Sequence, residues 1–243
     1  MKKNLIFACL FFTLFSSVSF AQDKKVAVVT FYVNKKINVE EFGPTAVIAV
    51  NKLSDDPNFN MEPLLKSFHL QFFDSYSKDF PFQLIPEDQV INNDAYKAFV
   101  PVGVASDGLL DIKKFATVIP GYKVLLEKLM GHKNEKDMLK IFNQVDGVMD
   151  VSISFKLVKI GFGGMGVAKV MAKANIALFN KNGDLVFSVD EDAKSSGVAP
   201  LVAGVPVMTV EKIMPMCESA MDALKSDLEK DMPKMVKKAD KKL

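Results

Sequence analysis

The sequence predicts a single α/β domain of two or three layers, in which helices cover a mixed sheet that contains an antiparallel hairpin. Three observations predict it. An apolar segment of strand length spans residues 25–33, strictly alternating segments fill residues 151–193, and amphipathic segments of helical period occupy residues 64–76 and 209–232. The last of these predicts a long C-terminal helix.

Residues 1–21 have the three regions of a secretory signal peptide. Lys2 and Lys3 supply the positive charge, residues 5–14 are apolar but too short to span a bilayer, and residues 19–21 fit a small-x-small cleavage site. We therefore expect an exported protein that begins at Gln22 after cleavage. It would be periplasmic or extracellular, with association with the outer membrane left open, and a single N-terminal anchor helix is the alternative.

Composition excludes one class of partner. Lys2 and Lys3 leave with the signal peptide, so the mature chain has as many basic as acidic residues, and no basic residue is an arginine. A neutral chain without arginine lacks the positive electrostatic field and the planar donor group that nucleic-acid recognition uses.

Cys217 is the only cysteine after the signal peptide, so an intramolecular disulfide is impossible. It lies on the apolar stripe of a predicted helix, which predicts a buried structural thiol.

The first half of the mature chain alternates strand and helix signals. Residues 25–33 are apolar almost without interruption, which predicts a strand covered on both faces. A loop with a short helix follows over residues 39–53, and an Asp-Asn-rich turn then leads into the helix at residues 64–76, which Pro63 opens. Residues 81–86 predict a short strand.

The next signals are a helix over residues 87–99 and an insertion over residues 100–131, where glycine and proline interrupt short apolar pieces. Asn134 is expected to cap a helix that buries four residues and stops at Gly147 in a left-handed conformation. The four buried residues are Met138, Ile141, Phe142 and Val145.

Period-two alternation defines the hairpin. Residues 148–160 place Val151, Ile153, Phe155 and Leu157 on one face, and residues 167–178 alternate apolar side chains with lysine and asparagine. The Asn-Gly pair within residues 180–184 favours a tight turn. The returning strand, residues 185–193, places Leu185, Phe187 and Val189 on one face.

The end of the chain is predicted to be a loop, a helix and a tail. The loop contains Pro200, Gly204 and Pro206, and the helix spans residues 209–232. Residues 233–243 are a lysine-rich tail, so the domain proper spans residues 22–232. The apolar stripe of the helix is Met214, Cys217, Met221, Leu224 and Leu228.

The order of these elements resembles a known envelope architecture. The segments KKVAVVTF, FQLIPEDQV, VDGVMDVSISFKL and ALFNKNGDLVFS, with helices after the first and last, are similar to the α/β fold of CsgG-type curli secretion components, LpoB-type penicillin-binding-protein activators and the N-terminal domain of TolB. The resemblance implies a non-enzymatic part of an envelope assembly. The chain departs from that pattern in the insertion at residues 100–131 and in having no acylated cysteine after Ala21.

One glycine-rich segment matches the sequence pattern of a nucleotide-binding motif but not its structural context. Residues 161–166, GFGGMG, fit G-x-G-x-x-G, but the dinucleotide fingerprint needs a helix directly afterwards to bind the pyrophosphate. Residues 167–178 predict a strand instead. We therefore interpret the run as a hairpin connection and expect no small-molecule cofactor.

Other candidates for chemistry have simpler interpretations. His69 and His132 have no metal-ligand spacing around them, and we assign neither to a site. Residues 190–192, Asp-Glu-Asp, fit a solvated edge strand that discourages aggregation. The acidic turn at residues 55–60 lacks the glycine and glutamate of a calcium loop, so it is interpreted as the entry to a helix. No catalytic, cofactor-binding or metal residue is assigned.

Two functional hypotheses follow, with a third in reserve. The first is an exported, non-enzymatic module that contacts another envelope protein or itself through a sheet edge, the glycine-rich hairpin or the methionine-rich final helix. The second is a subunit of an oligomeric outer-membrane secretion pore. The third is a hydrolase of uncharacterised type that acts through unrecognised carboxylates.

Overall fold

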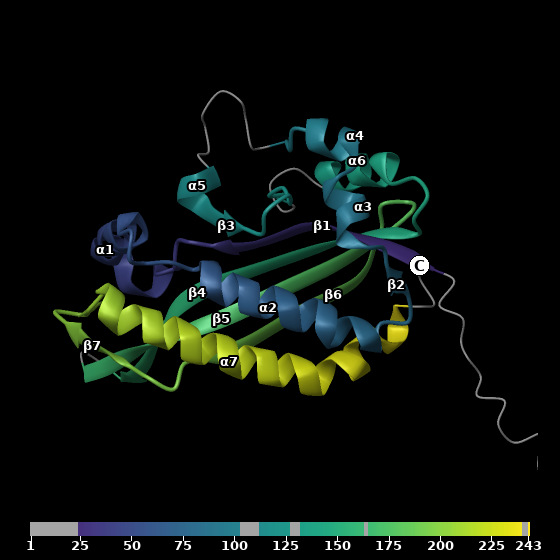
Figure 1. The fold of residues 1–243 in the computed structure, drawn as a ribbon. Helices are drawn as coiled ribbons and strands as arrows, with labels where there is room; N and C mark the ends of the chain where they lie inside the picture. Colours follow the sequence, from purple (N-terminus) through teal and green to yellow (C-terminus); the bar gives the residue numbers. More distant parts are fainter. Residues whose placement is uncertain (1–23, 103–111, 127–131, 163–164, 240–242) are drawn as a thin grey trace, which may run out of the picture.

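The computed structural model has a mixed α/β fold built on an open eight-stranded sheet (Figure 1). It describes residues 24–102, 112–126, 132–162, 165–239 and 243, so the predicted signal peptide lies outside the described residues. The strands run in the order β2-β1-β4-β5-β7-β8, with β3 paired to β1 and β6 paired to β5. They are β1 (Lys25–Asn34), β2 (Gln83–Leu84), β3 (Ala116–Val118), β4 (Gly147–Phe162), β5 (Met165–Asn180), β6 (Leu185–Lys194), β7 (Ala199–Val202) and β8 (Val205–Pro206).

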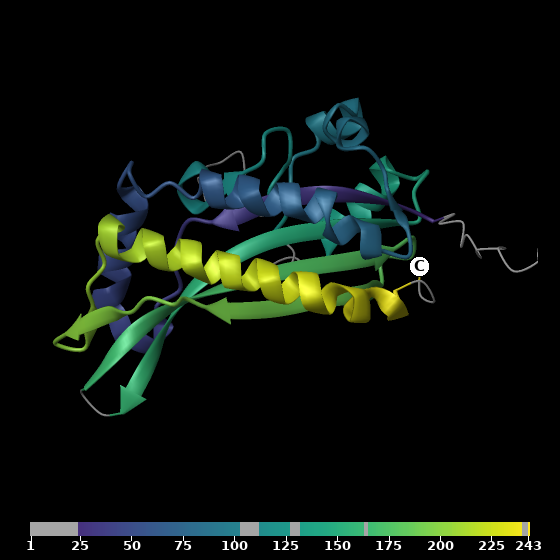
Figure 2. The same ribbon diagram turned by 60° about the horizontal axis from the view of Figure 1, so that its bottom comes forward.

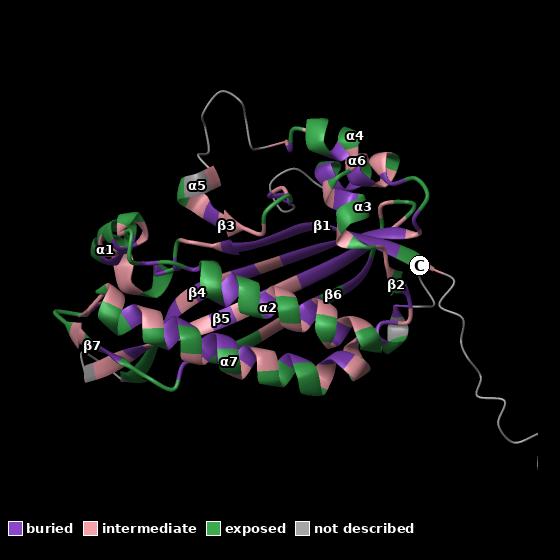
Figure 3. Ribbon diagram, viewed as in Figure 1, coloured by how far each residue is buried: buried purple, intermediate pink, exposed green. Residues whose placement is uncertain are grey.

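Two long helices cover one face of this sheet. In Figures 1 and 2, α2 and α7 lie side by side across it, and Figure 3 shows buried residues along both helices. The aromatic ring of Phe31 in β1 lies 5.5 Å from Phe72 of α2. The helices are α1 (Gly43–Asp55), α2 (Glu62–Asp74), α3 (Glu87–Ile91), α4 (Asp94–Ala98), α5 (Ile112–Phe115), α6 (Lys133–Ile141) and α7 (Val210–Met235).

A partial third layer covers the other face near the start of β1 and β4. Tyr96 of α4 packs on Phe142 at 5.7 Å, and His132 at the start of α6 packs on Phe179 at 5.0 Å. Phe179 is the partner of Val148 in the β4–β5 ladder, which places α6 opposite α2 and α7. The architecture is therefore two-layered with a third layer over part of the sheet, as the sequence predicts.

The predicted antiparallel strands of residues 151–193 are confirmed, and the structure gives their register. β4 and β5 pair without interruption from Gly147↔Asn180 to Phe162↔Met165, and Gly183 adopts the positive φ of +80° that the turn to β6 requires. A bulge at Leu178/Phe179 shifts the β6 register. As a result Leu185 is 49% exposed, and it does not share the buried face of Phe187 and Val189 as predicted.

Two helix predictions are wrong in detail. The helix expected over residues 87–99 is split into α3 and α4, because Asn93 is extended and its side chain accepts a hydrogen bond from the Tyr96 amide at 3.0 Å, which starts a new helix. Asn134 does not cap α6. His132 holds that position, and the buried Asn134 side chain pairs with the backbone of Val102.

Gly147 does not stop a helix. α6 already ends at Ile141, and Gly147 begins β4. Its lack of a side chain is required by a close approach, since a Cβ at this position would lie 2.5 Å from the carbonyl oxygen of Phe179.

The C-terminal helix is longer than predicted. α7 continues to Met235, and beyond it Val236 and Ala239 are buried. Within the helix, Ile213 is fully buried and Met214 only partly, so the core stripe begins one residue earlier than predicted. The segment with Pro200, Gly204 and Pro206 is not a plain loop, because it forms the β7–β8 hairpin.

The insertion at residues 100–131 is described only in part. Its described residues include α5 and β3, and β3 pairs antiparallel with the end of β1. None of the helices in the described part of the chain combines the length and the apolar composition that a membrane span needs.

Candidate functional site

The two faces of the sheet differ in chemistry because successive side chains of a strand point to opposite sides. In β4, Val151, Ile153 and Phe155 point towards α2 and α7 and are buried. Their neighbours Ser152 and Ser154 point to the other side, which we call the polar face. The same alternation in β1, β5 and β6 makes this face polar across four strands.

A groove of about 320 Å³ lies on the polar face. We call it the polar groove. It is lined by Thr30, Tyr32, Asn34, Leu125, Leu126, Asp150, Ser152, Ser154, Lys173, Asn175 and Asp190.

Strand register brings these residues together from distant parts of the chain. Tyr32 lies beside Ser152, Ser152 beside Asn175, and Asn175 beside Asp190, so one row of four side chains crosses β1, β4, β5 and β6. This row is a consequence of pairing, because cross-strand neighbours are held about 5 Å apart. The floor of the groove is therefore an array of hydroxyl, amide and carboxylate groups on a backbone that the strand ladder holds in place.

The charges of the groove lie towards its two ends. Lys173 forms an ion pair with Asp190 at 2.7 Å, with both side chains partly exposed. Asp150 is only 5% exposed and lies beside Thr30 in the ladder. Burial raises the pKa of the nearby Tyr96 hydroxyl, and the negative charge of Asp150 raises it further against the hydrogen bond from the Lys123 amide, so Tyr96 stays neutral.

A buried hydrogen-bond network fixes the wall that carries Leu125 and Leu126. The Thr30 hydroxyl donates to the Lys123 carbonyl at 2.6 Å. Tyr96 donates to the Val29 carbonyl at 2.7 Å and accepts from the Lys123 amide at 2.9 Å. These bonds attach the segment after Tyr122 to β1, so the wall of the groove is held by the same strand that forms its floor.

A second polar cluster joins α2, α3 and the turn before this wall. Glu87 Oε1 lies 2.6 Å from His69 Nε2 and accepts a hydrogen bond from the Tyr122 hydroxyl at 2.8 Å. Burial opposes ionisation of Glu87, but its bonds with His69 and Tyr122 outweigh burial and lower the pKa of the carboxyl. The His69 ring packs between Phe31 and Phe73, each 4.9 Å away. This packing explains a histidine on the buried side of α2.

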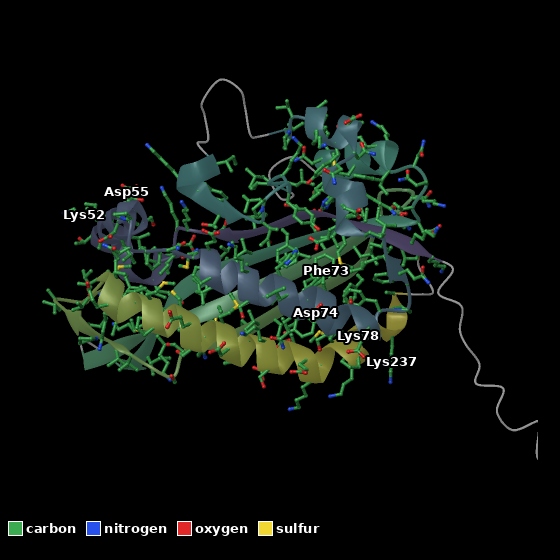
Figure 4. The ribbon with its side chains drawn as sticks, viewed as in Figure 1. Lys52, Asp55, Phe73, Asp74, Lys78 and Lys237 are labelled. Carbon is green, nitrogen blue, oxygen red and sulfur yellow. The ribbon has the colours of Figure 1, made fainter. Side chains whose placement is uncertain are left out.

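Glu87 also borders a shallower cavity of about 450 Å³ between the end of α2 and β2. Phe73 and Lys78, both labelled in Figure 4, line it from the α2 side. Within the described residues, no group of three or more histidine, cysteine, aspartate or glutamate side chains could hold a metal ion. The contacts of Glu87 with His69 and Tyr122 instead connect α3 to α2 and to the turn before the groove wall, which is a structural role.

The glycine run lies at the end of the β4–β5 hairpin. Gly161 pairs with Gly166, and β5 follows immediately as a strand. Gly163 and Gly164 lie outside the described residues. The helix that would bind a pyrophosphate is replaced by a strand, which agrees with the interpretation of this run as a hairpin connection.

The remaining sequence candidates have structural roles. Cys217 is fully buried, and burial raises the pKa of its thiol, so it is an unreactive core residue. Asp56 accepts a hydrogen bond from the Asn58 amide at 2.8 Å in a turn that enters α2. Asp190 and Asp192 share the polar face of β6, an edge strand within the described sheet, and Glu191 faces α7.

Sequence reasoning missed the groove. Apart from two leucines, its residues are common polar types, they come from five separate stretches of the chain, and no motif links them. The signal that could have found them is the polar half of each alternating strand, which combines into a site only when the strand order is known.

The chain is similar to solved bacterial structures at low sequence identity. No protein-family model and no curated protein matches the chain. Among solved structures, a neuraminyllactose-binding hemagglutinin homolog from Helicobacter pylori matches with 10% identity and a TM-score of 0.36, over 86% of this chain and 82% of that one. A hypothetical protein from Chlamydia trachomatis has the same identity and score, over 86% and 97% of the two chains.

A lipoprotein from Neisseria meningitidis matches with 11% identity and a TM-score of 0.27, over 70% of this chain and 82% of that one. These three structures are bacterial proteins of low similarity to this chain. None of them shows a family-level match to the curli secretion, penicillin-binding-protein activator or TolB proteins, and scores this low assign no function.

Proposed function

We propose that the mature chain is an exported, non-enzymatic module that binds an envelope protein through the polar face of its sheet. The observation that carries this proposal is the polar groove, in which pairing of four strands fixes a row of hydrogen-bonding side chains from Tyr32 to Asp190. A fixed array loses little side-chain entropy when a partner binds, and this favours recognition.

The lining of the groove favours binding over catalysis. Its described residues supply hydroxyl, amide, carboxylate and ammonium groups but neither histidine nor cysteine, the side chains that most often act as base or thiol nucleophile. Lys173 is held by Asp190. Such a set suits a polar partner surface, because each donor or acceptor can be satisfied by a complementary group.

Export and domain organisation are part of the same proposal. We expect cleavage after Ala21, a single domain over residues 22–232 and a lysine-rich segment after it. Intact-mass measurement of the protein isolated from its native host should give Gln22 as the first residue. A folded cellular protein that retains residues 1–21 would contradict the proposed export and favour an N-terminal anchor.

Site-specific crosslinking tests the binding face. A photoreactive residue in place of Ser154, on the groove floor, should give a discrete adduct with one envelope protein in living cells. The matched control is Leu70, which is 60% exposed on the outer side of α2 and should give none. Adducts of equal pattern from both positions, or none from Ser154, would overturn the proposed binding face.

One observation favours the pore subunit as a second candidate. β4 and β5 are each 16 residues long and continue past β6, so their hairpin projects from the body of the molecule (Figure 2). Ile160 near its end is 40% exposed. Resistance of the mature protein to carbonate extraction, together with a heat-stable oligomer, would favour this candidate over the contact module.

A further inference from the structure

β6 forms an outer margin of the sheet. It pairs with β5, and no other strand of the described residues lies against it (Figure 2). With 10 residues it is long for an edge strand. Edge strands of this length present a row of backbone donors and acceptors that another extended chain can use.

The alternation of hydrogen-bonded and non-bonded positions along β5 and β6 shows which residues of β6 direct their backbone groups away from the sheet. The Ser195 amide donates to the Val170 carbonyl at 2.7 Å, directly after β6. In an antiparallel pair, bonded and non-bonded positions alternate, so Glu191 and Ala193 direct their backbone groups to β5. The residues between them direct theirs away from the sheet. Those outward residues, all exposed, are Ser188, Asp190, Asp192 and Lys194.

Acidic side chains flank this edge on both faces of the sheet. Asp192 is exposed on the polar face next to Asp190, which is paired with Lys173. Glu191 lies on the opposite face, where burial and then the charges of Asp227 and Asp231 on α7 raise its carboxyl pKa. A strand that approaches β6 therefore meets negative charge above and below its backbone.

We propose that β6 accepts an extended segment of the partner protein as an additional strand, and that this segment carries lysine or arginine at alternate positions. The inference rests on the proposed function and deepens it, because Asp190 belongs both to the groove and to the edge. A basic segment satisfies the outward backbone groups. Its cations, which alternate positions place on one face, lie opposite Asp190 and Asp192 on the polar face. A second copy of β6 is disfavoured, since antiparallel pairing would bring the acidic residues of both strands together.

Amide exchange with a synthetic probe tests the mode of binding. The probe is a peptide of about ten residues in which lysine alternates with threonine and valine. Its binding should slow solvent exchange of the Ser188, Asp190, Asp192 and Lys194 amides at least tenfold, as measured by NMR. The amides of Glu191 and Ala193 already bond to β5 and should change little.

Two variants separate backbone pairing from charge. Ser188→Pro removes an outward amide without removing a bond to β5, so it should weaken probe binding at least tenfold, whereas Ser188→Ala should stay within twofold. Asp192→Lys should also weaken binding at least tenfold. The matched charge control is Asp55→Lys, an exposed position on α1 (Figure 4) that should stay within twofold.

Several outcomes would overturn the inference. They are equal binding of a probe with glutamate in place of lysine, no binding of either probe, self-association through β6 in place of probe binding, and no effect of Asp192→Lys. The two proposals fail differently. Probe-induced shifts of Asn175 without protection of the β6 amides would reject strand addition and retain the polar face, whereas loss of the Ser154 crosslink would reject the face itself.

Discussion

The two faces of the sheet are built from the same strands but are stabilised differently. The face under α2 and α7 is closed by apolar contacts, among them the packing of Phe72 on Phe31 and Phe80. The other face is covered over one part by the third layer, which is held by ring packing such as that of Tyr96 on Phe142 and by hydrogen bonds of Thr30 and Tyr96. It is open over the polar groove. Apolar burial is therefore concentrated under α2 and α7 and under the third layer, which leaves the side chains of the polar groove available for contact.

The largest expected effect is on the helix-covered face. Phe72→Ala removes a fully buried ring and should lower the free energy of unfolding by about 3–5 kcal/mol, because transfer energy and packing are both lost. Urea unfolding of the mature protein measures it. Leu70→Ala on the same helix, at an exposed position, should cost less than about 0.5 kcal/mol. Equal costs would show that α2 does not close this face.

The hydrogen-bonded part of the polar face should be less sensitive. Tyr96→Phe removes a hydroxyl that bonds the Val29 carbonyl and the Lys123 amide, and should cost about 1–3 kcal/mol, since both backbone groups lose a buried partner. Denaturation gives the cost, and amide exchange of Lys123 shows whether the groove wall loosens. Unchanged exchange would mean that the wall is held by other contacts.

The stability that the His69–Glu87 cluster contributes should depend on pH. Glu87 has a lowered pKa in the folded state, so its ionised form adds stability above the unfolded pKa of about 4.3, and this contribution is lost as the pH falls through the folded pKa. Glu87→Gln should therefore be about 1 kcal/mol less stable than the wild type at pH 7. The two proteins should converge near pH 3. A constant difference across this range would assign the role of Glu87 to packing.

The smallest effect on stability is expected in the groove. Asn175→Ala lies on the polar face at a partly exposed position and should change unfolding by less than about 0.5 kcal/mol, while it weakens partner binding. Crosslinking yield from Ser154 in this background is the readout. Loss of both stability and crosslinking would show that Asn175 contributes to the fold as well as to binding.

Prediction from sequence succeeded where one local signal was sufficient. Period-two alternation gave β4 and β5, and helical period gave α2 and α7, because each of these elements buries a face of its own. It failed where local signals compete, as at Asn93, which opens a second short helix, and at Gly147, whose requirement is a close approach by Phe179.

The candidate site was beyond prediction for a different reason. Thr30, Asp150 and Asn175 become neighbours only through the strand order, which places the N-terminal strand beside β4 in parallel. The His69–Glu87 contact likewise joins α2 to α3 across the aromatic packing around Phe31. No spacing in the sequence encodes such pairs.

Hydrogen exchange of the whole mature protein, with and without an extract of its native envelope, shows whether the polar face and β6 form the binding surface. We expect slower exchange in β6 and in the groove segments of β1, β4 and β5, with no change on the outer sides of α2 and α7. Protection confined to those two helices, or no protection anywhere, would contradict this expectation.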